Sequence, residues 1–101
     1  MWLFALFDLP VMTRVQRKRA VQFRTLLLRE GFSMLQLSVY ARYCASEDIG
    51  DRFVDRIRSH LPPEGQVRLL LVTDRQFGKM KVFYGKTAKE PEAPPLQRLL
   101  F

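Results

Sequence analysis

Along the first ten residues, bulky apolar side chains occupy both alternating positions of an extended chain. The two sets are Trp2, Phe4 and Leu6 on one face, and Leu3, Ala5 and Phe7 on the other. An apolar pattern on both faces predicts a strand that is covered on both sides. Pro10 cannot donate to a strand ladder and favours extended geometry before it, so we expect the strand to end at Leu9.

Asp8 is the one charge in this opening strand, near its carboxyl end. One interpretation is structural, in which the carboxylate caps the following turn or pairs with an arginine. The other is chemical, in which it binds a cation. From its position alone, we favour the structural interpretation.

A helical period follows over residues 14–30, with Thr13 as the expected N-cap and Gly31 after the last turn. Val15, Ala20, Phe23, Leu26 and Leu27 gather on one face, and Arg14, Arg17, Lys18, Arg24 and Arg29 gather opposite. Together with Arg19, three of these cations crowd the first turns, where the helix dipole is already positive. This placement favours phosphate binding, although an ordinary solvated basic face explains it as well.

The period changes to two over residues 32–43, which predicts a long strand that must bend or bulge if it serves as two strands. Ser46 is the expected N-cap of a second helix over residues 47–60. Its apolar stripe consists of Ile49, Phe53, Val54, Ile57 and Leu61. His60 falls at the end of this helix, where we expect it to meet unsatisfied carbonyls rather than to act in catalysis.

The LPPEG turn leads into a strand over residues 66–73 that is again apolar on both faces. Helices can cover one side of such a small sheet, and we expect a second copy of the chain to cover the other. Residues 74–78 should form a turn, and residues 79–84 a half-exposed basic strand. Residues 86–95 resemble a linker, and the apolar tail 96–101 should add a strand to a sheet edge, either its own or its partner's.

The pattern strand, helix, two strands, helix and strand predicts an α+β fold, the ferredoxin-like two-layer sandwich βαββαβ with an additional C-terminal strand. We expect one domain over residues 1–85, followed by the linker and pairing tail over residues 86–101. RNA-recognition domains share this topology, but their aromatic signature is missing from residues 66–73. An apolar sheet face suits a partner subunit better than a stacked base.

Composition narrows the possible partners. The 101 residues carry 17 Lys and Arg against 10 Asp and Glu, a formal net charge of +7, which favours nucleic acid. The opening apolar run is far shorter than the roughly 20 residues that cross a bilayer, and it lacks the features of a signal peptide. We therefore expect a cytoplasmic protein without membrane association. A single cysteine, Cys44, and a single histidine exclude a disulfide framework and a zinc centre within the chain.

Several sequence blocks, in order along the chain, resemble one protein family. The blocks are FDLP, LLREGF, MLQLSVYARYC, LPPEG followed by VRLLLVTDRQF, and MKVFYG. They run from Met1 to about Gly85 and resemble the CRISPR-associated Cas2 family, particularly the form that accompanies single-effector systems.

The resemblance implies a homodimeric CRISPR adaptation protein. It would join two dimers of the integrase Cas1 while new spacer DNA is captured and inserted into the repeat array. Family members are also described as Mg²⁺-dependent endonucleases for single-stranded RNA or double-stranded DNA. The family's conserved aspartate corresponds to Asp8, and its C-terminal pairing strand corresponds to the tail residues Leu96, Leu99, Leu100 and Phe101.

Metal-dependent phosphodiester hydrolysis needs several oxygen ligands, and this chain offers one well-placed acid. Two copies of Asp8 meeting across a twofold axis could hold one Mg²⁺ with waters. Asp74 is the other acid at a strand end, and only its position would involve it. We therefore expect a nucleic-acid scaffold, with nuclease activity left open. The alternatives are a non-enzymatic RNA-binding module and a toxin-like messenger RNA nuclease of the same topology.

As a scaffold, the protein should grip duplex phosphates with little dependence on base sequence. The residues that we expect to do so are Arg14, Arg17 and Lys18, together with Arg19 and Lys79.

Overall fold

The computed structural model of the chain describes residues 1–85 and 87–88. In chain order, the elements are β1 (Trp2–Asp8), α1 (Arg14–Arg29), β2 (Ser33–Gln36), β3 (Val39–Tyr43), α2 (Glu47–Arg58), β4 (Gln66–Val72), α3 (Asp74–Gly78), β5 (Phe83–Tyr84) and β6 (Thr87–Ala88). None of the described helices combines the length and the apolar character that crossing a membrane requires.

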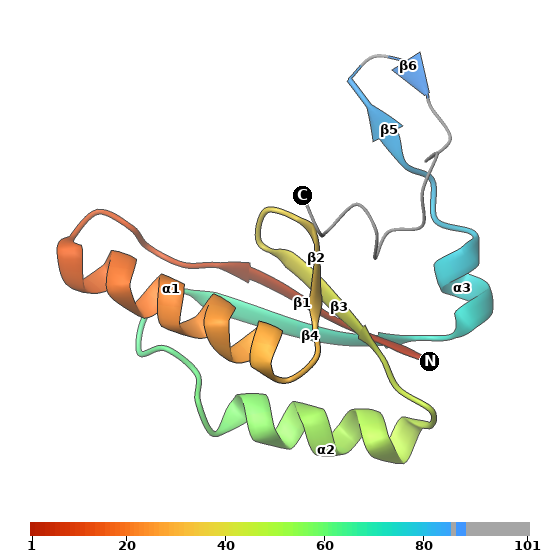
Figure 1. Ribbon diagram of the computed structural model, residues 1–101, viewed down its shortest axis with the longest axis horizontal. Coiled ribbons are helices and arrows are strands. Elements are labelled where there is room, and N and C mark those ends of the chain that lie inside the picture. Colours follow the sequence, from red (N-terminus) through yellow and green to blue (C-terminus); the bar gives the residue numbers. More distant parts are fainter. Residues whose placement is uncertain (86, 89–101) are drawn as a thin grey trace.

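The first six elements form the predicted βαββαβ arrangement. An antiparallel sheet with the order β2-β3-β1-β4 is covered on one side by α1 and α2 (Figure 1). The central strand β1 pairs with both neighbours, so that Ala5 lies opposite Tyr40 on β3 and Leu69 on β4. This is the ferredoxin-like two-layer α+β sandwich that the sequence pattern predicted.

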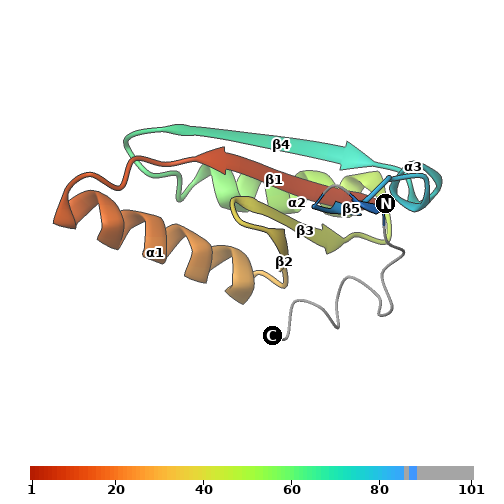
Figure 2. The same ribbon diagram turned by 90° about the horizontal axis from the view of Figure 1, so that it is seen from above.

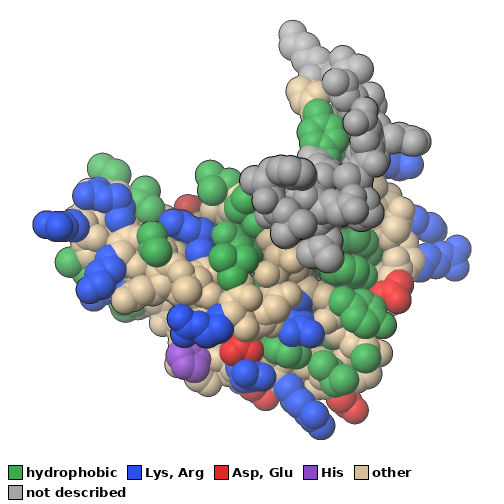
Figure 3. Space-filling view, viewed as in Figure 1, with side chains coloured by type: hydrophobic (Ala, Val, Ile, Leu, Met, Phe, Trp, Pro, Cys, Tyr) green, Lys and Arg blue, Asp and Glu red, His purple; other side chains and the backbone are tan. Residues whose placement is uncertain are grey.

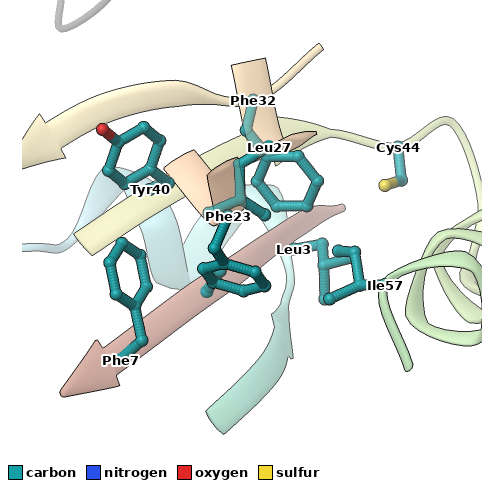
Figure 4. Packing of buried hydrophobic residues seen from close by; sticks show 9 residues of the cluster. Leu3, Phe7, Phe23, Leu27, Phe32, Tyr40, Cys44 and Ile57 are labelled. Atoms are coloured by element: carbon teal, nitrogen blue, oxygen red, sulfur yellow. The ribbon is translucent and has the colours of Figure 1, made fainter. Parts of the chain in front are cut away.

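The core fills the space between the sheet and the two helices (Figure 4). Its buried hydrophobic residues are Leu3, Ala5, Phe7, Ala20, Phe23, Leu27, Phe32, Tyr40, Ala41, Cys44 and Ile57. The Phe7 ring meets the Phe23 ring edge-on, with centroids 5.2 Å apart, and the Tyr40 ring lies 5.5 Å away. Aromatic pairs in these geometries gain stability beyond the area that they bury, so they fix how α1 lies on the sheet.

Both long helices begin at the N-cap residues that the sequence predicted. Thr13 accepts a hydrogen bond from the Gln16 backbone and begins α1, and Ser46 does the same for α2 through the Ile49 backbone. Gly31 has a φ of 86°, the left-handed conformation expected after a helix. Each helix ends slightly before the predicted boundary.

Val15 is 56% exposed, so its predicted place on the buried face of α1 was wrong. The first turns of α1 extend past the end of the sheet and have nothing to cover them (Figure 1).

The segment 32–43 is two strands rather than one. β2 and β3 form a hairpin whose register shifts between Met34 and Gln36. Ser38, which immediately precedes β3, has a φ of 65°, an uncommon conformation for a residue with a Cβ atom. The bend and bulge that the length of this segment required are therefore both present.

Two predictions after β4 were wrong. Residues 74–78 form the short helix α3 rather than a turn, because Thr73 and Gln76 make a capping box. Of residues 79–84, only Phe83 and Tyr84 are in a strand, and they pair with β6 in a separate hairpin instead of joining the main sheet. Residues 86 and 89–101, which include most of the expected linker and the whole pairing tail, lie outside the described residues.

The sheet face opposite α1 and α2, here called the open face, has no second layer of helices among the described residues (Figure 2), and its strand positions are largely apolar. Within residues 1–85 and 87–88, ring contacts cover one corner of this face, where the Phe77 ring of α3 stacks on Trp2 at 4.3 Å and contacts Phe4 at 5.7 Å. Leu70 lies opposite Phe4 and is 54% exposed, and Tyr43 is 49% exposed. A single chain therefore leaves a large part of this face in water.

Candidate metal and nucleic-acid site

Asp8 is the last residue of β1 and faces the open side of the sheet. Side chains alternate along a strand, and the buried positions are Leu3, Ala5 and Phe7, so Asp8 shares its face with Leu6. The carboxylate is exposed, and it has no hydrogen-bond or ion-pair partner among the described residues. The structural role that we favoured for Asp8, capping a turn or pairing with an arginine, is therefore wrong.

Gly65 allows the backbone at the start of β4 to lie close to the backbone of Asp8 at the end of β1. It precedes β4 and has a φ of 90°. A Cβ atom there would lie 2.5 Å from the Asp8 carbonyl oxygen and 3.1 Å from the Leu9 Cα, a contact that the two backbones could not relieve without moving. Any other residue at this position would displace the end of β1, and Asp8 with it.

One chain does not assemble a metal centre around Asp8. Within residues 1–85 and 87–88, no three Asp, Glu, His or Cys side chains are grouped closely enough to hold a metal ion. Asp74 begins α3, beyond the opposite end of β4, and its carboxylate lies 2.8 Å from the amino group of Met1. The exposed, partnerless carboxylate of Asp8 fits Mg²⁺ chemistry only if further oxygen ligands come from water and from a second chain.

The loop between β1 and α1 is held by side chains of α1. The Gln16 Oε1 atom accepts hydrogen bonds from the backbone N–H groups of Met12 and Thr13, at 2.9 and 3.0 Å. The Arg17 guanidinium donates to the carbonyl oxygens of Val11 and Met12, at 3.2 and 3.3 Å. Arg17 therefore fixes this loop, which leaves fewer of its donors for an external phosphate.

The remaining cations at the start of α1 differ in how free they are. Arg14 and Lys18 are exposed and have no ion-pair partner among the described residues. Arg19 lies 3.4 Å from the Glu64 carboxylate, in a weak pair of half-exposed side chains. Lys and Arg side chains gather over this end of α1 in Figure 3, and the first turn of α1 contains no acid.

Lys79 lies far from the cations at the start of α1. It caps the C-terminus of α3, which follows the end of β4, whereas Arg14 follows the end of β1. Because β1 and β4 are antiparallel, the two residues lie toward opposite ends of the sheet. The tail residues 96–101 lie outside the described part of the chain.

The side chains of His60 and Tyr40 interact with neighbouring parts of the fold. The His60 Nδ1 atom is 2.9 Å from the Arg56 carbonyl oxygen, as expected for a histidine at a helix end. Burial raises the pKa of the Tyr40 hydroxyl, and the positive charge of Arg24 opposes part of that rise.

The sequence reasoning missed Gly65 and Gln16. Gly65 was interpreted as part of an ordinary turn, because its contact with Asp8 depends on how two distant strands pair. Gln16 had a visible signal, since Thr13 followed by a Gln at the third helical position is a capping-box pattern.

Comparison with known proteins agrees with the resemblance noted in the sequence. The family model for CRISPR associated protein Cas2 matches residues 1–80. A protein named CRISPR-associated endoribonuclease Cas2 from Flavobacterium psychrophilum is 46% identical over 100% of this chain and 88% of its own length. Its namesake from Parvibaculum lavamentivorans is 45% identical over the whole of both chains.

A solved structure shows the same fold. The crystal structure of Streptococcus pyogenes Cas2 at pH 6.5 matches with a TM-score of 0.63 and 15% identity, covering 83% of this chain and 100% of that one. The sequence matches establish the family independently of this likeness. This chain belongs to the CRISPR-associated Cas2 family.

Proposed function

We propose that this protein is a homodimeric CRISPR adaptation factor. It binds double-stranded DNA as a scaffold between dimers of the integrase Cas1 during capture and integration of new spacers, and it works in the cytoplasm. The observation that carries the proposal is the open face, which ends in Asp8 and which one chain leaves half exposed. The tail, residues 96–101, would supply the pairing strand toward the partner copy or the integrase.

The apolar character of the open face supports the proposed dimer. Leu70 and Tyr43, each about half exposed, give it accessible apolar area, and a second copy offers the same surface in a self-complementary arrangement. Two chains mated through this face would exclude water from residues such as Leu70. They would also bring a second carboxylate toward Asp8 if the twofold axis runs near the end of β1, since Asp8 shares this face.

Duplex binding rests on the cations of α1. Arg14 and Lys18 are exposed and unpaired in the described structure, so they can meet phosphates without breaking an existing contact. Arg17 and Arg19 would support them, the first by fixing the loop before α1. Lys79 would touch phosphates farther along a duplex. Such contacts carry little base specificity and weaken with salt.

A nuclease activity is supported by the surroundings of Asp8 and by the endoribonuclease names of the relatives. Mg²⁺ held by two Asp8 carboxylates would neutralise phosphate charge and lower the pKa of a bound water. The chain's own contribution is to present an unpaired carboxylate on a rigid strand end, to position it through Gly65, and to hold the substrate backbone with Arg14 and Lys18. Single-stranded RNA and double-stranded DNA both supply the required phosphodiester.

One paired experiment separates scaffold from nuclease. Asp8→Asn and the double variant Arg14→Glu with Lys18→Glu are compared with wild type in three assays: spacer acquisition, RNA and DNA cleavage with Mg²⁺, and duplex binding at several salt concentrations. We expect Asp8→Asn to lose cleavage but to bind DNA and acquire spacers. The double variant should bind duplex more weakly and lose acquisition. The slope of its log binding constant against log salt concentration should be shallower by about 0.9 for each phosphate that the protein no longer neutralises.

Arg52→Glu with Arg58→Glu is the matched control, since it changes the net charge equally on exposed positions of α2. The scaffold proposal fails if both double variants bind and acquire alike. It also fails if Asp8→Asn stops acquisition while its DNA binding is intact, because the enzymatic step would then be essential.

A further inference from the structure

A groove lies on the helix side of the molecule, away from the open face. It runs between α1 and the loop that leaves α2, and its volume is about 410 Å³. Its lining residues are Arg19, Gln22, Phe23, Leu26 and Arg29 from α1, with His60, Leu61, Pro62 and Pro63 from the loop. Of the residues that the proposed dimer, duplex contacts and Asp8 site use, Arg19 is the one that also lines this groove.

The groove is apolar along its floor and wall. Phe23 and Leu26 lie at its base, and Leu61 on the loop is 44% exposed. The two prolines that follow Leu61 keep this wall extended and without a backbone N–H. The surface is thus stiff before any ligand arrives, which reduces the entropy lost on binding.

The charges of the groove all have one sign. Arg19 and Arg29 lie ten positions apart on α1, and no acidic residue lines the groove among the described residues. The Glu64 carboxylate outside the groove lies 3.4 Å from the Arg19 guanidinium in an exposed, weak pair that a ligand carboxylate can replace. Arg29 has no ion-pair partner there. The His60 Nδ1–H donates to the Arg56 carbonyl oxygen, so Nε2 of the neutral ring is an acceptor and the two arginines are the donors that face an anion. The groove therefore fits a ligand that is apolar in the middle and anionic at its ends.

The spacing of the cations favours a peptide over a nucleotide. Ten helical positions correspond to about 15 Å, which an extended peptide covers in about five residues. A nucleotide would need an aromatic face for its base, but Phe23 is only 3% exposed and offers none. A peptide needs only a small apolar pocket between two cations.

We propose that this groove binds a short acidic segment of a partner protein, with an apolar side chain on Leu26 and Leu61 and acidic residues near Arg19 and Arg29. Because the groove is on the helix side, such a segment binds while the open face is engaged and while Arg14 and Lys18, which do not line the groove, contact phosphates. The protein would then hold a protein partner and nucleic acid at the same time.

The test measures fluorescence anisotropy of a labelled probe with the full chain. The probe is a short peptide with a leucine between two glutamates about five residues apart. Arg29→Glu should weaken binding of the probe about tenfold or more, since it places a carboxylate next to a glutamate carboxylate of the probe. Arg52→Glu changes the net charge equally outside the groove and should alter binding less than about twofold. Leu61→Ser should weaken binding of the peptide. The dependence of that binding on salt concentration should stay the same, because the substitution removes an apolar contact and no charge.

Several results would overturn the inference. These are equal effects of Arg29→Glu and Arg52→Glu, equal binding of a probe with lysines in place of the glutamates, or no saturable binding. Displacement of the probe by duplex DNA would assign the groove to nucleic acid, and stronger binding of a peptide of residues 89–101 would assign it to the chain's own tail. Duplex titrations of the same variants report separately on the proposed function.

Discussion

A Cβ atom on Gly65 would stand 2.5 Å from the carbonyl oxygen of Asp8, so β4 begins closer to the end of β1 than a side chain allows. The φ of Gly65, 90°, adds a second reason for glycine. The candidate catalytic carboxylate thus depends on a residue that has no side chain and that lies far from it in sequence.

Gly65→Ala should therefore disturb both stability and the site. We expect the free energy of unfolding to fall by about 1–3 kcal/mol, because the substitution imposes a strained φ and a backbone clash. Chemical denaturation measures this loss. Gly78→Ala is the control, since its Cβ would meet nothing within 4 Å. Equal stabilities of the two variants would contradict the close approach.

The open face should control the oligomeric state. Leu70→Glu places a charge where a second copy would remove it from water, so we expect the dimer dissociation constant to rise by about tenfold or more. Leu28→Glu is the matched control, because Leu28 is 55% exposed on α1 and Leu70 is 54% exposed on the sheet. Analytical ultracentrifugation measures the mass and circular dichroism checks the fold. A wild-type protein that is monomeric at high concentration would refute the dimer.

Arg42 should stabilise the junction between α1 and the sheet. Its guanidinium donates to the Glu30 carbonyl oxygen at 2.7 Å, and lies 3.8 Å from the centre of the Phe53 ring. Arg42→Lys keeps the positive charge but removes the planar guanidinium group. We therefore expect the free energy of unfolding, measured by thermal or chemical denaturation, to fall by about 1–2 kcal/mol.

Arg56→Lys provides a comparison for Arg42, since Arg56 lies farther from the same ring, at 5.4 Å, and is 61% exposed. We expect its loss of stability to be smaller than that of Arg42→Lys. A larger loss for Arg56→Lys would mean that the carbonyl contact of Arg42 contributes little.

Tyr40 should make the protein sensitive to alkali. Burial raises the pKa of its hydroxyl in the folded state, so the folded chain holds this proton more tightly than the unfolded chain. The resulting stability is complete below the unfolded pKa of about 10 and is lost as pH rises through the higher folded value. When the pH is raised from neutral to above about 10, the free energy of unfolding should therefore fall less for Tyr40→Phe than for wild type. Denaturant titrations across this range test it, and parallel pH profiles would count against it.

Features that depend on neighbouring residues were predictable from the sequence. Thr13 and Ser46 cap the helices through residues three positions away, and the strand period places Leu3, Ala5 and Phe7 on the one face of β1 that is buried. The order of these elements was enough for the fold, because few topologies accommodate them.

Features that depend on distant pairing were not predictable. The alternation of residues 79–84 indicates a strand but says nothing about which strand lies beside it, and only Phe83 and Tyr84 found a partner, in β6. Likewise, the helical period cannot show that Val15 lies beyond the end of the sheet. The separation of Lys79 from Arg14 required the direction of β4, and the groove beside Arg29 required the packing of α1 against the loop after α2.

The burial of Cys44 offers a practical route to measuring distances between two copies. It is the single cysteine of the chain and is 1% exposed, so thiol reagents should leave it unmodified while the protein is folded. A cysteine introduced at an exposed position would then be the only one to accept a spin label or a fluorophore. Labels at several such positions, one at a time, would give the distances between equivalent residues in the proposed dimer and thereby locate its twofold axis.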